Sequence, residues 1–275
     1  GLFLFLFISH TFASGLEVAV SILPQKTFVE AIGKEKVQVT LMVEPGSSPH
    51  SYEPKPSQMK GLDRAKLYFA IGVEFESMWL SRFANQNKTM QIVDTSKGVK
   101  KLSMQEGHQI KRHNHKGDDP HIWTSPENVK IISRHILDAL IQSDPTNKSY
   151  YEANYAQWIE HVQSVDSAIK ENLQNIKNGK FMVFHPAWGY FAHQYGLEQI
   201  AIEVEGKEPK PNQMSELIKQ AKAEKIGAVF VAPEFSQKLA IQIAKELNVP
   251  VVTVSPLDPD WGENLVQLSH AISNH

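Results

Sequence analysis

Short apolar runs alternate along the chain with longer segments whose apolar residues recur every three or four positions. The short runs are typical of buried strands and lie at 17–22, 37–43, 67–71, 91–94, 181–184, 199–204, 228–232 and 250–254. The longer segments are typical of helices and lie at 24–32, 57–65, 76–83, 187–195, 213–225, 235–247 and after Gly262. Alternation of this kind predicts an α/β fold, with parallel sheets covered by helices on both faces.

Two consecutive helices interrupt this alternation in the middle of the chain. Ser125, Pro126 and Glu127 supply a capping hydroxyl, a proline for the first helical position and an acid for the first turn, which predicts a helix up to about residue 142. A second helix follows Asp144-Pro145 and meets no glycine or proline before Gly179. About 30 residues at about 1.5 Å each make a rod of roughly 45 Å. We therefore predict two βα lobes, 16–143 and 179–275, joined by one long rigid helix over 144–178.

The first fifteen residues form an uncharged stretch rich in Leu, Phe and Ile that closes on Ala13, Ser14 and Gly15. Its apolar part is too short to span a bilayer as a helix. It is typical of the end of a secretory signal, so we expect residues 1–15 to be a signal remnant and the mature protein to be periplasmic or otherwise extracytoplasmic. An apolar first strand is the alternative.

Composition narrows the classes of partner and of site. A hydrophobic content of 41% with 21% charged residues is typical of a globular protein, and we expect a monomer. The formal net charge of −2 provides no basic field, so we expect no nucleic-acid partner. The sequence contains no cysteine, which excludes disulfides, zinc–thiolate sites, thiol nucleophiles and a lipid-anchor cysteine within it. A metal site in this chain must therefore use imidazole and carboxylate ligands.

Histidines gather in the segment "HQIKRHNHKGDDPHIW" that spans 108–123. His108, His113 and His115 lie in a polar loop over about 104–119, a composition typical of metal binding. His121 follows a proline in a tight turn and precedes a tryptophan, as expected of a fixed ligand. We interpret His121 as a ligand and the other three as an accessory, weakly zinc-capturing or merely solvated loop.

Further candidate ligands lie just beyond predicted strands, where open α/β sheets bind their ligands. His50 follows the strand at 37–43, His185 follows 181–184 and Asp258 follows 250–254. Each has a structural alternative, as a loop histidine, a helix-capping histidine or a turn aspartate. Together with His121 they place two ligands in each lobe, so they can converge only between the lobes. Three imidazoles and one carboxylate suit tetrahedral Zn²⁺, whereas Mn²⁺ prefers more oxygen ligands.

The motifs "PGSSPHSYEPKPSQ", "DPHIWTSP" and "FHPAWGYF", with a carboxylate after the last strand, resemble the solute-binding proteins of zinc and manganese ABC importers, the ZnuA-like cluster A-I (cluster 9) family. The resemblance covers essentially the whole mature chain. It implies high-affinity extracytoplasmic Zn²⁺ binding between two lobes and delivery to a cognate ABC permease in the membrane. It also implies His50, His121, His185 and Asp258 as ligands. Manganese-selective relatives have glutamate at the third position, so His185 favours Zn²⁺ over Mn²⁺ or Fe²⁺.

Some assignments stay open at this point. Asp260, Glu53 or water compete with Asp258 for the fourth position, and His135, His161 and His193 are expected to be structural. A zinc-dependent hydrolase is the competing class, but the sequence has no HExxH, GxSxG or Walker motif. We therefore expect a carrier and not an enzyme.

Overall fold

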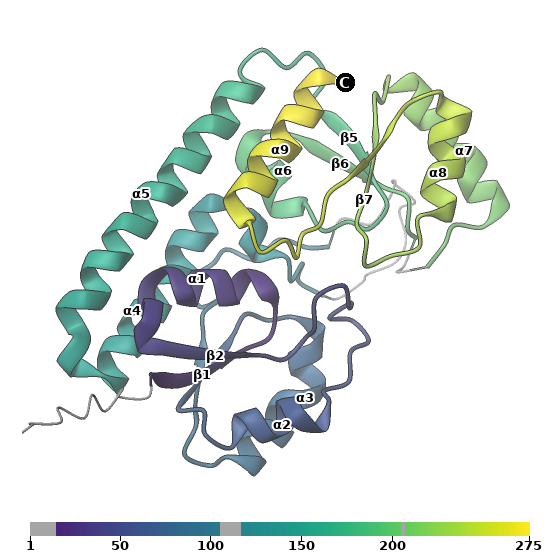
Figure 1. The fold of residues 1–275 in the computed structure, drawn as a ribbon. Helices are drawn as coiled ribbons and strands as arrows, with labels where there is room; N and C mark the ends of the chain where they lie inside the picture. The colour runs from purple at the N-terminus through teal and green to yellow at the C-terminus, as the bar shows by residue number, and fades with distance from the viewer. Residues whose placement is uncertain (1–14, 105–116, 205–206) are drawn as a thin grey trace, which may run out of the picture.

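The structure is a computed structural model that describes residues 15–104, 117–204 and 207–275. The first described sheet has four parallel strands in the order β2-β1-β3-β4. Its strands are β1 (Leu16–Val20), β2 (Val37–Leu41), β3 (Leu67–Ala70) and β4 (Gln91–Asp94). The helices α1 (Leu23–Gly33), α2 (Pro56–Leu62) and α3 (Glu74–Gln86) connect them, so this lobe is built of repeated βα units around a buried apolar core. Figure 1 shows strands β1 and β2 side by side, beneath α1.

The second described sheet repeats this strand order as β6-β5-β7-β8, again with every pairing parallel. Its strands are β5 (Lys180–Val183), β6 (Glu198–Ala201), β7 (Val229–Val231) and β8 (Val251–Thr253). Its helices are α6 (Gly189–Tyr195), α7 (Pro211–Ala223), α8 (Lys238–Leu247) and α9 (Trp261–Asn274). The predicted fold class, two parallel-sheet lobes with a long helix, is confirmed.

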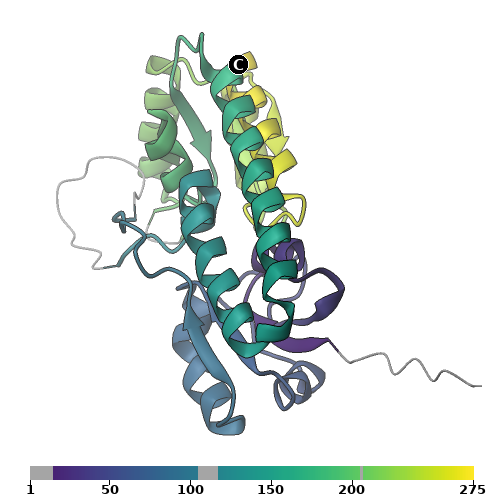
Figure 2. The ribbon, with the colours of Figure 1, turned by 90° about the vertical axis from the view of Figure 1, so that its left-hand side faces the viewer.

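Helices α4 (Pro126–Ser143) and α5 (Lys148–Leu173) run side by side along the molecule (Figure 2). The Ser125 side chain accepts a hydrogen bond from the Asn128 amide, which confirms the predicted cap. Helix α5 packs against α1 and α4 of the first lobe and α9 of the second. Its 26 residues make a rod of about 39 Å, shorter than expected. At its start, 145–147 form a 3₁₀ turn, and the Asp144 side chain accepts hydrogen bonds from Asn147 and Tyr151. At its other end, the helix stops at Leu173 and not at residue 178.

One set of buried apolar side chains runs through both lobes and includes Val20 of β1, Ile169 of α5 and Val183 of β5. Successive residues of β5 point to opposite faces, so Met182 belongs instead to a smaller cluster under α7 and α8. The large shared set means that the lobes are packed against each other as well as against α5. The predicted lobe boundaries stay a prediction, because the fold itself does not mark where one lobe ends.

Most predicted elements are present with ends shifted by one to three residues. The shift that matters is at α8, which begins at Lys238 and not at residue 235, and so leaves 232–237 as a loop at the end of β7. Within the part of the chain that the structure describes, no helix combines the length and apolarity needed to cross a bilayer. Residues 1–14 of the predicted signal remnant 1–15 and the loop histidines His108, His113 and His115 lie outside the described residues.

Candidate metal centre

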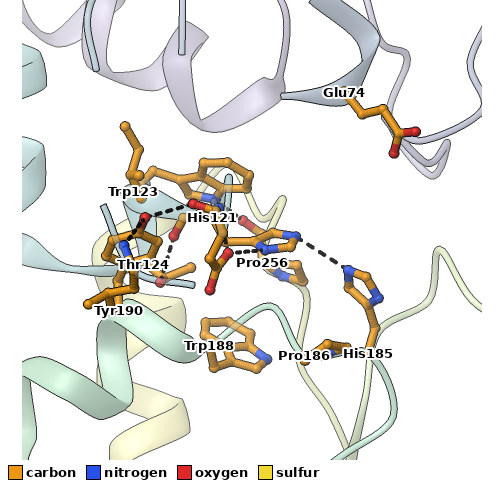
Figure 3. A network of polar contacts seen from close by, with 12 residues as sticks. Glu74, His121, Trp123, Thr124, His185, Pro186, Trp188, Tyr190 and Pro256 are labelled. Carbon is orange, nitrogen blue, oxygen red and sulfur yellow. Dashed lines mark hydrogen bonds and ion pairs between the residues drawn. The ribbon is translucent and has the colours of Figure 1, made fainter. Parts of the chain in front are cut away.

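Three histidines from three different loops converge between the lobes. His50 lies in the turn-rich loop after β2, His121 lies just before the 3₁₀ turn Ile122–Thr124, and His185 lies two residues after β5. The Nε2 atom of His185 lies 3.3 Å from Nε2 of His50 and 3.3 Å from Nε2 of His121. Each of the three offers a ring nitrogen within 4.8 Å of the other two. Figure 3 shows His121 and His185 directed at each other.

Each imidazole is held from behind by a carboxylate. Nδ1 of His50 lies 2.9 Å from Glu74 Oε2, and Nδ1 of His185 lies 2.7 Å from Glu203 Oε2. Nδ1 of His121 lies 2.7 Å from Asp119 Oδ1.

A carboxylate accepts hydrogen bonds, so this arrangement places the ring proton of each neutral imidazole on Nδ1. The lone pairs of all three Nε2 atoms are then available to a cation, and the three rings lie close enough together to bind the same ion. Carboxylate partners of this kind orient a metal-binding imidazole and raise its basicity. The three rings are therefore preorganised to bind one cation.

Burial favours the neutral form of His185. Desolvation lowers its pKa, and the neighbouring His121 lowers it further, while the hydrogen bond to Glu203 opposes both effects. The ring of Phe235 stacks on His185 with 4.5 Å between ring centroids and an interplanar angle of 21°. Neutral imidazole is the form that binds a metal ion, so the burial of His185 favours metal binding by this side chain.

The His121 turn is fixed by its own aspartate and by the second lobe. Asp119 Oδ1 also accepts a hydrogen bond from the His121 amide, and the Asp119 carbonyl accepts one from Tyr190. The other carboxylate oxygen of Asp119 lies against Gly189, where a β-carbon would come within 2.6 Å of it. Close approach therefore explains the glycine at the first position of α6.

Glu74 is positioned by Glu76, two residues further along α3. The buried carboxylate of Glu76 accepts hydrogen bonds from Ser21 and from the amides of Ile71 and Gly72, and so fixes the loop that leads into α3. Burial raises the pKa of Glu76 to about 7, despite these hydrogen bonds. This anchor places Glu74 at the helix start, facing His50.

Asp258, the predicted fourth ligand, does not belong to the group formed by the three histidines in the described residues. Its Oδ1 accepts a hydrogen bond from the Asp260 amide, and it borders a neighbouring cavity of about 190 Å³. The histidines border a cavity of about 20 Å³, space for roughly one water-sized particle. Asp260 and Glu53, the other carboxylates considered, are exposed and border neither cavity. A ligand role for Asp258 stays a prediction.

The three histidines that were expected to be structural lie outside the cluster. His135 Nε2 lies 2.8 Å from the Lys97 carbonyl oxygen, and the His161 ring packs on Trp158. His193 is exposed on α6. None of them belongs to the three-histidine group.

Sequence reasoning missed the carboxylates behind the histidines and the Glu234-Phe235 pair. Asp119 could have been found, because it lies two residues before His121 in the same turn. Glu74 and Glu203 lie 24 and 18 residues from their histidines, so no local spacing identifies them. The predicted helix 235–247 placed Phe235 at its first position and Glu234 just before it, whereas the structure has both residues in a loop beside the site.

A cluster of three imidazoles between two parallel-sheet lobes, with a long helix packed on both, defines a metal-binding protein of the two-lobed α/β class. The chain belongs to the ZnuA family, described as zinc-uptake complex component A, periplasmic, which it matches over residues 18–272. The family resemblance predicted from the motifs is therefore confirmed. The match also supports a binding role over the hydrolase alternative.

Individual relatives include zinc and manganese proteins. The chain is 28% identical over 269 residues to the zinc-binding lipoprotein AdcA of Streptococcus pneumoniae, covering 92% of this chain and 53% of AdcA. It is 28% identical over 233 residues to the manganese ABC transporter substrate-binding lipoprotein PsaA of the same species, covering 80% and 73%. A crystal structure of a ZnuA deletion mutant with zinc bound has a TM-score of 0.88 at 38% identity, covering 94% and 97%. The chain thus spans about half the length of AdcA.

Proposed function

We propose that this protein binds Zn²⁺ outside the cytoplasm through His50, His121 and His185 and delivers it to the membrane permease of an ABC-type importer. The convergence of three carboxylate-backed Nε2 atoms from both lobes carries the proposal. The family description, zinc-uptake complex component A, and the name of the zinc-binding relative AdcA support zinc uptake as the context. Zn²⁺ is the cargo of this protein and leaves it again.

The ligand set favours zinc over manganese. Imidazole nitrogen suits Zn²⁺, whereas Mn²⁺ is better served by carboxylate, carbonyl and water oxygens. The carboxylates of Asp119, Glu203 and Glu74 engage the Nδ1 atoms and are not directed at the ion position. Manganese binding, the function in the name of PsaA, is therefore the alternative. A zinc hydrolase requires a group that activates a metal-bound water molecule. The carboxylates of Asp119, Glu203 and Glu74 are unsuited to that task, because they contact the Nδ1 atoms.

Binding ties the lobes together, since His50 belongs to the first lobe and His185 to the second. Helix α5 packs on both lobes, and one buried apolar cluster contains residues of both. These contacts oppose a large rotation of one lobe relative to the other. We therefore expect small lobe movements and local adjustment of the loops that carry the ligands. His50 and its partner Glu74 are the exposed pair of the site, with 30% and 59% of their side chains accessible. The ion enters and leaves on this side.

The test is a competitive zinc titration of His121→Ala and His185→Ala against a chelator of known affinity. Loss of the carboxylate that hydrogen-bonds a metal-binding histidine typically weakens metal affinity about 10- to 100-fold. Loss of the histidine itself removes a direct bond to the ion, so we expect it to weaken zinc binding at least about 100-fold. His135→Ala is the matched control, because this histidine bonds the Lys97 carbonyl far from the site. Zinc at about 1,000 times its Kd is expected to stabilise the wild type by about 4 kcal/mol and the variants far less. Unchanged titrations in both variants would contradict the proposed function.

A further inference from the structure

Glu234 borders the same cavity as the three histidines and has a carboxylate oxygen with no assigned role. Its Oε1 atom accepts a hydrogen bond of 2.6 Å from the Ser255 hydroxyl. Its Oε2 atom is buried and, within the described part of the chain, has no hydrogen-bond partner. Leaving a buried carboxylate oxygen unpaired costs free energy, so such an atom calls for a ligand. A cation in the adjoining cavity supplies one.

Sheet topology places Glu234 beside a zinc ligand. Strands β5 and β7 are parallel neighbours. From β5 the chain first forms β6 on one side and then returns to form β7 on the other side, so the strand order switches between β5 and β7. Open α/β sheets bind ligands beyond the carboxyl ends of the strands at such a point. His185 lies two residues beyond β5, and Glu234 lies three residues beyond β7. The stacking of Phe235 on His185 fixes the loop of Glu234 against the site.

Asp258 is less well placed. It follows the edge strand β8 by five residues. It borders the neighbouring cavity, as Glu234 also does, but unlike Glu234 it does not line the cavity of the histidines. Its segment is fixed on one side by the Trp123 indole, which donates a hydrogen bond of 2.6 Å to the Pro256 carbonyl. On the other side the Trp261 indole donates to the Trp123 carbonyl. Bringing Asp258 to the histidines would disturb this pair of indole contacts.

We propose that Glu234, and not Asp258, is the carboxylate that completes the metal site. Three imidazoles leave one position of a tetrahedral zinc site, and a carboxylate oxygen fits it. Glu234 lies outside the group that has all its ligand atoms within 4.8 Å, so its side chain rotates toward His185 when the ion binds. This inference rests on the proposed zinc-binding function and names the fourth ligand of that site.

The test compares Glu234→Gln with Asp258→Asn. Each amide keeps a carbonyl oxygen, so it still accepts the hydrogen bond that the wild-type residue accepts from Ser255 or from the Asp260 amide. Each substitution therefore removes one negative charge and preserves shape and local bonding. Zinc affinity is measured by chelator competition, and coordination is read from the visible absorption of the Co²⁺-loaded protein. Glu234→Asp, which keeps the charge on a shorter side chain, is the second variant.

We expect Glu234→Gln to weaken zinc binding at least about tenfold and to change the Co²⁺ spectrum, with Glu234→Asp between it and the wild type. Asp258→Asn is expected to bind within about twofold of the wild type with the same spectrum. The inference is overturned if Asp258→Asn produces the larger loss, or if all these variants retain wild-type affinity and spectra. Failure of the proposed function looks different, because the wild type itself would then not depend on His121 or His185.

Discussion

The carboxylates behind the three histidines differ in burial, and this difference predicts how much each supports zinc binding. The His121–Asp119 pair has 5% and 1% of its side chains accessible, and the His185–Glu203 pair has 8% and 8%. The His50–Glu74 pair has 30% and 59%. Replacing each acid by its amide, as Asp119→Asn, Glu203→Gln and Glu74→Gln, removes the charge and little else.

The expected magnitudes follow from that burial. Loss of a ligand's carboxylate partner typically costs about 10- to 100-fold in metal affinity, or about 1.4–2.7 kcal/mol, and the two buried pairs are expected in this range. An exposed charge pair is screened by solvent and contributes at most about 1 kcal/mol, which corresponds to about fivefold. Glu74→Gln is therefore expected to be the mildest of the three.

The assay is competitive zinc titration at fixed pH and ionic strength, with circular dichroism to verify folding. Glu171→Gln, an exposed acid on α5, controls for the loss of one negative charge elsewhere. The reasoning is refuted if Glu74→Gln costs as much as the two buried substitutions, or if Asp119→Asn and Glu203→Gln match the control. Either result would mean that the partners do not act through charge and desolvation.

Two further predictions concern pH and close packing at the site. The pKa of His185 is lowered in the folded apo-protein, whereas in the unfolded chain it keeps its ordinary value of about 6.5. As the pH falls through about 6.5, the unfolded chain therefore binds a proton before the folded protein does, and the free energy of unfolding decreases. We expect zinc affinity, titrated between pH 7.5 and 5.5, to fall as protons compete for the imidazoles, and apo His185→Gln to show a flatter dependence of unfolding free energy on pH than the wild type. An equal slope would contradict the shift. Gly189→Ala is expected to displace the Asp119 carboxylate and to weaken zinc binding about tenfold in titration, since its β-carbon would lie 2.6 Å from Oδ2. Gly179→Ala, whose nearest contacts are at 3.6 Å, is the tolerated control, and equal zinc affinity in the two variants would contradict the argument.

The sequence by itself determined the βα alternation, the capped start of α4 and the three histidines. These features are local. Strand and helix periodicity can be read from consecutive residues, and a ligand at the end of a parallel strand is identified by its position after an apolar run. His121 was marked by its own Pro-bracketed turn, and His50 and His185 by the strands that precede them. For His50 and His185, position along the chain and placement in space agree because the loops that follow parallel strands open at the same edge of their sheet.

Only the tertiary structure decided which carboxylates face the site. The strand order makes β5 and β7 neighbours and leaves β8 at the edge. Glu234 therefore lines the cavity of the histidines, whereas Asp258 lines only the neighbouring one of these two cavities. Glu203 reaches His185 because β6 pairs with β5, a fact that no spacing along the chain contains. A side chain's distance from a metal site depends on strand order and loop course, and both are set by packing of the whole fold.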